Sequence, residues 1–302
     1  MVKILVTDKI HEDGVKLLKG FAEVSVATGL TPAELLKRIK GYDVLVVRSA
    51  TKVTKEVIDA GKQLRVIARA GAGLDNIDVK AAEARGIKVV NAPEAPTVAV
   101  AELVFAHMLS FARHMPRADA SMKRGGWEKG QLIGTELRGK TLGIVGTGRI
   151  GRAVGYKAKA FLMNLLLYDV VQNREFAKQT EAKYVELDTL LRGSDYVTLH
   201  VPLLPETEHM IGARELGLMK PTAVLINTSR GEVVDEMALA EALQAKKIAG
   251  ACLDVYEREP PQESPLLKLP NVVLTPHLGA STVESQRDAA VIIAKKIKEA
   301  LV

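Results

Sequence analysis

Three short segments each place a charged or titratable side chain where it could take part in chemistry. They are NTSRG with Arg230, DVYEREP with Glu259 and TPHLG with His277, and each follows a run of residues typical of a strand. Arginine binds a carboxylate through paired hydrogen bonds, and histidine transfers protons near neutral pH. A glutamate bonded to the imidazole orients it and raises its pKa. The three groups together suit the oxidation of a hydroxy acid.

A structural interpretation of the same residues stays open at this point. His277 could be a structural histidine after a proline turn, and Glu259 and Arg230 could form a surface ion pair. We give the structural interpretation to four other histidines. They are His11, His107, His114 and His209. Spacing alone does not choose between the two interpretations.

A glycine-rich turn is the strongest single pattern in the chain. Residues 141–152, TLGIVGTGRIGR, combine a short apolar strand with glycines at 146, 148 and 151 and the start of a helix. In this G-x-G-x-x-G spacing, Gly146 permits a tight turn and Gly148 lets the backbone approach a pyrophosphate. Gly151 lets the helix pack closely on the strand. The pattern predicts a dinucleotide-binding loop.

Two neighbouring features support that prediction. The start of the helix presents the N–H groups of Arg149 and Ile150, together with a positive dipole end, to phosphates. A second expected strand, 164–168, ends at Asp169, which lies 18 residues past Gly151 and can accept hydrogen bonds from ribose hydroxyls. Asp169 would repel a 2′-phosphate, so we expect NAD in preference to NADP. The alternative is an ordinary strand–helix turn with a chance acid downstream.

The composition fits a globular protein with two domains and a small anionic ligand. The 302 residues are 47% hydrophobic and 26% charged, and no apolar run approaches the about 20 residues of a membrane span. The net charge of +6 suits anions, but dispersed basic residues and 4% aromatics argue against nucleic acid. One cysteine, Cys252, excludes an intrachain disulfide and favours a cytoplasmic location, and its apolar neighbours suggest a buried strand.

The elements that must position these residues alternate along the chain. In the first part we expect strands at 3–7, 22–26, 43–47, 65–68 and 87–90, with helices near 11–19, 31–40, 54–60 and 77–85. Thr31 and Glu34 have the spacing of a capping box. Two prolines within 91–96 indicate a boundary.

The second part continues the alternation around the glycine-rich turn. A long apolar helix is expected over 97–122, with a break near Pro116, and strands are expected at 196–200, 223–226, 248–253 and 272–274. A helix covers 235–245, and a capping-box pattern at 281–284 opens the last helix. The pattern predicts an α/β protein with two doubly wound parallel sheets and a ligand cleft between the domains.

The order of these motifs resembles that of a known family. GTGRIGR, NTSRG, DVYEREP and TPHLGAS are similar to the D-isomer-specific 2-hydroxyacid dehydrogenases. VRSATKVT, RAGAGLDNID and ASMKRGGWEKGQLIGTEL look most like the phosphoglycerate dehydrogenase branch of that family. The resemblance covers nearly the whole chain, and it implies NAD-dependent oxidation of 3-phospho-D-glycerate, the first step of serine synthesis. It also implies a homodimer formed through the helix from Thr97 and the following basic loop.

The resemblance further implies a domain plan and residue roles. A Rossmann NAD-binding domain, 97–277, would be inserted in a flavodoxin-like substrate domain, 1–96 plus 278–302. Arg230 would bind the substrate carboxylate, Glu259 would support the acid–base His277, and no metal would be needed. The implied NAD-binding residues are Gly146, Gly148, Arg149, Ile150, Gly151, Asp169, Val201, Thr228, Asp254 and Gly279. The implied substrate-binding residues are Arg48, Ser49, Ala72, Gly73 and Lys129.

Several departures and alternatives accompany the resemblance. Leu162 and Val170 stand where family members often have glycine and proline, and Tyr256 replaces a common phenylalanine. The sequence stops 25 residues after His277, so we expect a short form without the C-terminal regulatory domain of longer relatives. The alternatives are a glyoxylate or hydroxypyruvate reductase on the same scaffold and, outside enzymes, an NAD-sensing co-repressor.

Overall fold

The computed structural model describes all residues from 1 to 302, and the chain forms two compact units. Unit 1 contains Met1–Thr97 together with Ala280–Val302, and unit 2 contains Val98–Gly279. Each unit is built on its own parallel sheet, so the expected α/β class with two doubly wound sheets is confirmed.

The sheet of unit 1 has five parallel strands in the order β2-β1-β3-β4-β5. The strands are β1 (Lys3–Val6), β2 (Glu23–Val26), β3 (Val44–Val47), β4 (Val66–Arg69) and β5 (Lys88–Asn91). This 2-1-3-4-5 order is that of flavodoxin-like sheets. The helices are α1 (Glu12–Lys19), α2 (Pro32–Arg38), η1 (Ile39–Gly41), α3 (Lys55–Ala60), α4 (Val79–Ala84) and α12 (Val283–Leu301).

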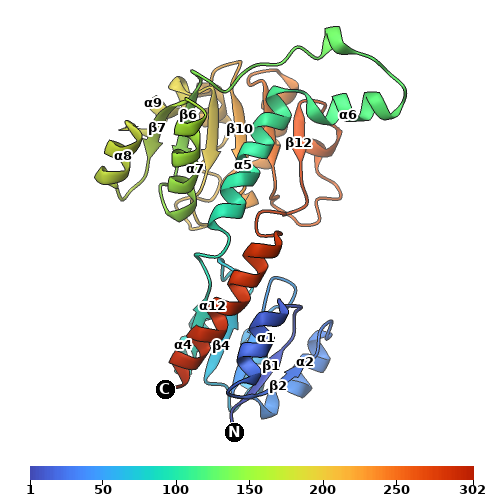
Figure 1. The fold of residues 1–302 in the computed structure, drawn as a ribbon, viewed down its shortest axis with the longest axis vertical. Coiled ribbons are helices and arrows are strands. Elements are labelled where there is room, and N and C mark those ends of the chain that lie inside the picture. The colour runs from blue at the N-terminus through green and yellow to red at the C-terminus, as the bar shows by residue number, and fades with distance from the viewer. The chain divides into compact units, whose positions relative to one another are not determined.

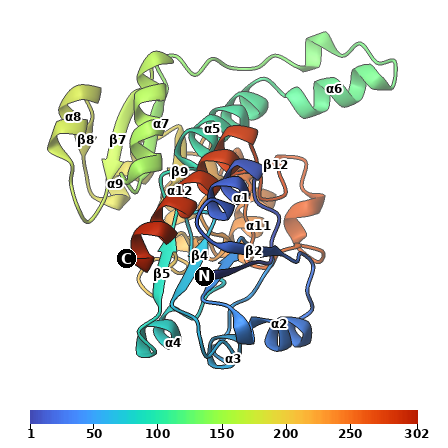
Figure 2. The same cartoon turned by 60° about the horizontal axis from the view of Figure 1, so that its bottom comes forward.

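Helices cover both faces of this sheet because its strands are apolar on both sides. Leu18 of α1 and Ile293 of α12 pack against one face, and Leu35 of α2 and Val57 of α3 pack against the other. Figures 1 and 2 show α1 and α12 side by side. Their close approach requires Gly14, where an added Cβ would collide with Ala290. The C-terminal helix is therefore an integral part of unit 1.

Two helix starts in unit 1 test the expected caps. The box at Thr31 is confirmed, because the Glu34 amide donates to the Thr31 hydroxyl and the Glu34 carboxylate accepts from the Thr31 amide. The expected box at 281–284 is wrong. Thr282 caps α12 and accepts a hydrogen bond from the Ser285 amide at 3.1 Å, which leaves Glu284 one position too early to close a box.

The sheet of unit 2 has seven parallel strands in the order β12-β11-β10-β9-β6-β7-β8. They are β6 (Thr141–Val145), β7 (Asn164–Tyr168), β8 (Lys183–Tyr184), β9 (Tyr196–Leu199), β10 (Val224–Asn227), β11 (Gly250–Leu253) and β12 (Val272–Leu274). Counted from β6, this is the Rossmann order, which reverses between β6 and β9. Ligands of such sheets bind beyond the strand ends at this reversal.

The helices of unit 2 also lie on both faces. They are α5 (Thr97–Ala112), α6 (Met115–Lys123), η2 (Lys129–Gln131), α7 (Arg149–Ala160), α8 (Arg174–Thr180), α9 (Leu187–Gly193), α10 (Ala213–Leu218), η3 (Gly231–Val233), α11 (Glu236–Gln244) and η4 (Pro265–Lys268). Residues of α5, α7 and α8 share one core cluster, and residues of α9, α10 and α11 share the other. The helices therefore cover the two faces of the sheet, and loops follow the carboxyl ends of its strands.

The long helix expected over 97–122 is two helices. The break comes at His114, whose φ of 53° is left-handed, and Pro116 occupies the first turn of α6, where proline is tolerated. No single helix is long and apolar enough to span a membrane, and α5 with α6 passes that test only as a pair bent by 64°. Figures 1 and 2 show α6 and the segment after it reaching out from the rest of unit 2.

Candidate functional site

The glycine-rich loop joins β6 to α7 as its spacing predicts. Gly146 has a φ of +91°, and a Cβ there would lie 2.6 Å from the carbonyl oxygen of His200, so glycine is required at this position. A Cβ on Gly151 would collide with the carbonyl of Gly146. A Cβ on Gly148 would meet no atom within 4 Å, which leaves the backbone open to a ligand. Arg149 and Ile150 form the first turn of α7, at the position expected for phosphate contacts.

Asp169 follows the end of β7 and is held in place by a directed chain of hydrogen bonds. Its carboxylate accepts from the Thr147 amide at 2.5 Å, from the Thr147 hydroxyl at 3.0 Å and from the Val171 amide at 3.0 Å. Because the Thr147 hydroxyl donates to Asp169, the Tyr184 hydroxyl, 2.8 Å away, must donate to Thr147. Tyr184 in turn accepts from the Asn173 amide at 2.9 Å. Asp169 is therefore oriented before any ligand arrives.

The remaining residues implied for NAD lie beyond the ends of β9, β10, β11 and β12. Val201 follows β9, and its methyl group would lie 3.0 Å from a Cβ on Gly146. Thr228 follows β10, is buried, and has a hydroxyl oxygen without a hydrogen-bond partner. A buried unpaired hydroxyl beside an open glycine loop is what a polar ligand would satisfy. These residues fit a bound dinucleotide.

His277 and Glu259 form a hydrogen-bonded pair beyond the ends of β11 and β12. The distance from His277 Nδ1 to Glu259 Oε2 is 2.7 Å, and both side chains are partly exposed. The second oxygen of Glu259 accepts from the Tyr256 amide at 3.3 Å. His277 itself has a left-handed φ of 54°, an uncommon conformation for a residue with a side chain. The expected hydrogen bond between Glu259 and His277 is present, and His277 has an uncommon left-handed backbone conformation.

The charges of this pair determine the histidine tautomer. The hydrogen bond to Glu259 raises the pKa of His277, against an opposing effect of burial. Burial pushes the pKa of Glu259 upward, but the hydrogen bond and charge of His277 outweigh it and lower that pKa. An ionised carboxylate only accepts, so Nδ1 of His277 must carry a proton. Nε2 is then left with the lone pair that can accept a proton from a substrate.

Arg230 lies close enough to both members of the pair to act on them electrostatically. It follows β10, and its guanidinium donates to the Ser229 carbonyl at 2.6 Å. Its positive charge lowers the pKa values of both His277 and Glu259. The structure therefore brings Arg230, Glu259 and His277 together at one edge of the sheet in unit 2, with a cation beside the acid–base group.

Asp254, which was expected to contact NAD, organises the loop that carries His277. Its buried carboxylate accepts from the Thr275 hydroxyl at 2.6 Å, from the Leu278 amide at 2.7 Å and from the Gly279 amide at 2.8 Å. The Thr275 hydroxyl donates to Asp254, so Nε2 of His107, 3.0 Å away, must donate to Thr275. His107 is thus a buried structural histidine, as expected, and supports the same loop.

The expected substrate residues of unit 1 lie on loops after β3 and β4. Two side chains that we did not single out from the sequence fix the first loop. Asp8 accepts from the Arg48 and Thr51 amides at 2.5 and 3.2 Å, and Asn76 donates to the carbonyls of the same two residues at 2.7 and 2.6 Å. The Arg48 guanidinium bonds only the Lys9 carbonyl, at 3.3 Å. Ser49 lies exposed within this loop.

The loop after β4 and the short helix η2 contain the remaining expected substrate residues. The carbonyls of Ala72 and Gly73 accept from the side chains of Asn91 and Arg69, whereas their amides donate no hydrogen bond within the chain. Free amides of this kind suit a carboxylate oxygen. Lys129 is exposed in η2, and its side chain has no partner within the chain.

Comparison with known proteins identifies the family. A family model described as "D-isomer specific 2-hydroxyacid dehydrogenase, NAD binding domain" matches residues 105–279. The chain belongs to this family. The matched residues include the glycine-rich loop and all three strand-end segments, so the expected resemblance and the NAD cofactor are confirmed.

Two curated relatives and one solved structure are similar to this chain over most of its length. It is 53% identical to the D-3-phosphoglycerate dehydrogenase of Methanocaldococcus jannaschii, over all of this chain and 58% of that protein. It is 46% identical to the hydroxypyruvate reductase of Thermotoga maritima, over 98% of this chain and 97% of that protein. D-lactate dehydrogenase from Aquifex aeolicus, in complex with NAD and lactic acid, has a TM-score of 0.89 and 31% identity, over 99% and 95% of the two chains. The chain spans little more than half the length of the phosphoglycerate dehydrogenases that it matches.

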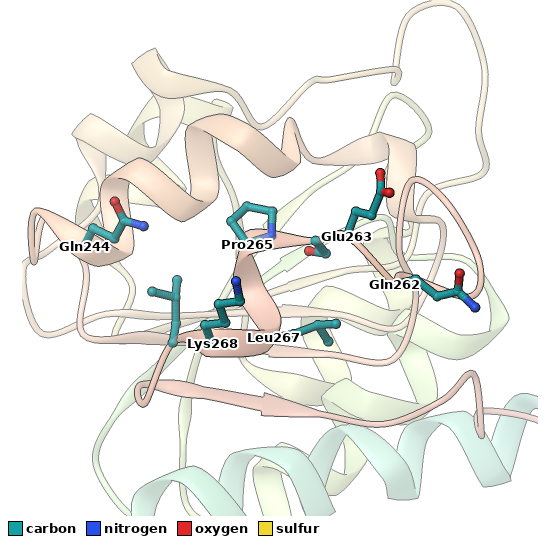
Figure 3. Close-up of a pocket in the computed structure, with 8 residues that line it drawn as sticks. Gln244, Gln262, Glu263, Pro265, Leu267 and Lys268 are labelled. Atoms are coloured by element: carbon teal, nitrogen blue, oxygen red, sulfur yellow. The ribbon is translucent and has the colours of Figure 1, made fainter.

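Unit 2 also has a cavity that none of the expected site residues lines. It measures about 310 Å³ and lies between the end of α11 and η4, with Gln244 and Gln262 at opposite ends (Figure 3). Its lining mixes one carboxylate, Glu263, one ammonium, Lys268, and apolar side chains. No buried polar atom there lacks a partner, so nothing in the lining indicates a ligand class.

Sequence reasoning missed the residues that hold the site in place. Asp8 lies two residues past the end of the apolar strand β1, and a carboxylate close to a strand end was a signal that could have found it. Tyr184 lies on β8, which is only two residues long and has no periodic pattern. His107 and Thr275 are far apart in sequence and meet only in the folded unit.

Proposed function

We propose that this protein oxidises 3-phospho-D-glycerate to 3-phosphohydroxypyruvate with NAD. The observation that carries the proposal is the His277–Glu259 pair beside Arg230 at the strand ends of an NAD-binding domain. Unit 1, expected as residues 1–96 plus 278–302, would contribute the substrate loops, and residues 97–277 would hold the cofactor.

Three residues of the chain have separate roles in the proposed reaction. NAD held by the glycine-rich loop and Asp169 would supply the acceptor for the hydride from C2 of the hydroxy acid. His277 takes the hydroxyl proton on Nε2, because Nδ1 is committed to Glu259, and C2 becomes a carbonyl carbon. Arg230 binds the carboxylate and polarises the developing carbonyl. Glu259 stabilises the imidazolium that results.

The substrate is the part of the proposal that needs a direct test. The similarity to phosphoglycerate dehydrogenases favours 3-phospho-D-glycerate, and the near full-length similarity to a hydroxypyruvate reductase favours an unphosphorylated substrate as the alternative.

A substrate panel distinguishes these two. We expect kcat/KM, followed as NADH formation, to be highest for 3-phospho-D-glycerate among phosphorylated and unphosphorylated D-2-hydroxy acids. The reverse reaction should favour 3-phosphohydroxypyruvate over hydroxypyruvate and glyoxylate. Faster reduction of hydroxypyruvate or glyoxylate would replace the proposed substrate with that of the alternative. NAD binding without turnover of any acid would contradict an enzymatic role.

The pH dependence of the reaction should follow the His277–Glu259 pair. Oxidation needs neutral His277, and Glu259 raises its pKa, so activity in this direction falls as pH drops below that raised pKa. Glu259→Gln removes the negative charge and should move the acid limb of the kcat/KM profile to lower pH. The alkaline limb of the reverse reaction should move in the same direction.

A second glutamate provides the matched control for this shift. Glu257 accepts from His209 at 2.9 Å in an exposed pair of the same kind. Glu257→Gln should leave both limbs in place. An unmoved acid limb in Glu259→Gln would contradict the assignment of Glu259.

We also propose that the protein is a homodimer joined through α6 and the segment that follows it. Trp127 and Ile133 are 80% and 81% exposed there, and Met122 is 55% exposed. Exposed apolar side chains along one extended segment suit a second copy of the chain. Sedimentation should give twice the 32.6 kDa chain mass, and Trp127→Glu should shift it toward monomer. Met237→Glu, at an exposed position on α11, is the control, and a monomeric unaltered protein would contradict the proposal.

A further inference from the structure

We propose that Asn91 and Lys296 are positioning residues for the carboxylate of the substrate. They fix the loop after β4 so that the amides of Ala72 and Gly73 stay free to donate to a ligand. The inference deepens the proposed function and rests on one part of it, namely that the substrate is a 2-hydroxy acid bound through its carboxylate. It does not depend on a phosphate in the substrate.

Asn91 fixes the peptide that joins Ala72 to Gly73. Its side-chain amide donates to the Ala72 carbonyl at 2.5 Å, and the Gly73 amide donates to no group of the chain. In a planar trans peptide the carbonyl oxygen and the amide hydrogen point in opposite directions. Because Asn91 holds the oxygen, the N–H of Gly73 points away from Asn91 and is available to a ligand.

The backbone next to Asn91 fixes the preceding peptide in the same way. The Ala92 amide donates to the Gly71 carbonyl at 2.9 Å, and the Ala72 amide of that peptide donates to no group of the chain. Two consecutive peptides of the loop therefore have bonded oxygens and free N–H groups. Successive free backbone N–H groups form a common kind of anion site, and a carboxylate has two oxygens for them.

Lys296 of α12 holds the peptide between Asn91 and Ala92 from the other side. β5 is an edge strand, and α12 packs beside it (Figure 2). The Ala92 amide points to the loop after β4, so the Asn91 carbonyl points the opposite way, where no strand can pair with it. The Lys296 ammonium donates to this carbonyl at 2.9 Å and pairs with Glu94 at 3.1 Å.

These bonds form one chain from the ammonium group to a free amide. The chain runs from Lys296 through the peptide of Asn91 and Ala92 to the peptide of Gly71 and Ala72. Hydrogen bonds in a chain polarise one another. The positive charge at one end therefore makes the Ala72 amide at the other end a stronger donor to an anion. The C-terminal helix thereby acts on a loop that lies much earlier in the sequence.

Two substitutions test this arrangement. Asn91→Asp keeps the shape of the side chain but replaces its donor with a carboxylate, which repels the Ala72 carbonyl and releases that peptide. Lys296→Met keeps a long side chain and removes its charge and its donors. Contacts to the carboxylate are made alike in the ground state and the transition state. We therefore expect both variants to raise KM for the hydroxy acid and to change kcat less than about twofold.

KM is measured at saturating NAD with the best hydroxy acid of the substrate panel. Asn91→Asp should raise it by about tenfold, the usual size of one charge-assisted hydrogen bond. Lys296→Met should raise it by about threefold, since its charge acts through two peptides. Lys296→Arg keeps the charge and should restore KM to within about twofold of the unaltered protein. KM for NAD should not change in any of the three.

A titration with oxalate measures the same subsite without turnover. Oxalate carries a carboxylate next to a second carbonyl carbon, as a 2-oxo acid does, and is added to the complex with NADH. Its dissociation constant should rise by the same factors as KM, and that of NADH should stay constant. If Asn91→Asp does not fold, Lys296→Met and Lys296→Arg decide the question. A parallel loss of NADH affinity would indicate a general effect on the fold and would overturn the inference.

The matched control is Lys295→Met. Lys295 is the exposed neighbour of Lys296 on α12, so the variant removes the same charge from the same helix. It should leave KM and oxalate binding unchanged. An equal rise in KM from Lys295→Met and Lys296→Met would mean that net charge alone acts, and a fall in kcat at constant KM would exclude a role in carboxylate binding. Either result would overturn the inference.

Three outcomes separate this inference from the proposed function. Oxidation of 3-phospho-D-glycerate with the same KM in the unaltered protein and both variants would overturn the inference alone. Oxidation of a different hydroxy acid, with KM raised in both variants, would replace the proposed substrate and leave the inference intact. Absence of both oxidation and oxalate binding in the unaltered protein would overturn both.

Discussion

His277→Ala is expected to lower kcat for hydroxy-acid oxidation by about 10²–10⁴-fold, which is the usual contribution of a positioned acid–base group. The expected loss is large because no other titratable ring lies in the same loop, and because Glu259 and the Asp254 network serve mainly to hold this imidazole. NAD affinity should stay nearly unchanged, since the glycine-rich loop and Asp169 belong to β6 and β7. The initial rate of NADH formation at saturating substrate gives kcat, and a binding titration gives the affinity for NAD.

His209→Ala is the matched control for this prediction. His209 also bonds a glutamate, is similarly exposed and has a left-handed φ of 49°, but it does not follow a strand end. Its loss should change kcat by only a few fold. A His277→Ala enzyme with near-normal kcat would exclude His277 as the acid–base group, and equal losses in both variants would indicate a general effect on the fold.

The glycine-rich turn shows how much of this site the sequence could predict. Gly146 and Gly151 are required by backbone collisions that any residue with a Cβ would cause, so their spacing reports a local geometry directly. The position of Asp169 follows from the length of one strand–helix–strand unit. Arg230, Glu259 and His277 were found because each lies in a segment that follows a short apolar run, and parallel strands bring their carboxyl ends to one edge.

What the sequence could not predict depends on contacts between distant residues. The orientation of Asp169 depends on Tyr184, and that of the His277 loop depends on His107 and Thr275. Local pattern predicted the break in the long helix near Pro116, and the structure has it two residues earlier. Pro116 was the obvious breaker, but proline is tolerated in a first turn, and the chain turns at His114 instead. The cap at Thr282 was missed by one residue because two adjacent hydroxyls compete for the same role.

The substrate phosphate also needs a binding residue, and Arg48 is the residue expected to bind it. A phosphate needs cations beyond Arg230, which the carboxylate occupies. A local ion pair was the alternative for Arg48, but its guanidinium pairs with no acid and donates only to the Lys9 carbonyl. Asp8 and Asn76 fix its backbone, so the side chain is presented from a rigid loop with most of its donors free.

Arg48→Ala should therefore lower kcat/KM for 3-phospho-D-glycerate by about tenfold or more, because charge-assisted hydrogen bonds contribute roughly 1.5–3 kcal/mol each. D-glycerate, which lacks the phosphate, should be affected little, so the ratio of the two kcat/KM values is the quantity to measure. Lys129→Ala should act in the same direction, and Lys52→Ala, an exposed charge four residues from Arg48, should leave the ratio unchanged. Equal losses on both substrates in Arg48→Ala and Lys129→Ala would remove these residues from phosphate recognition. That result would favour the reductase alternative, whose substrates have no phosphate for Arg48 to bind.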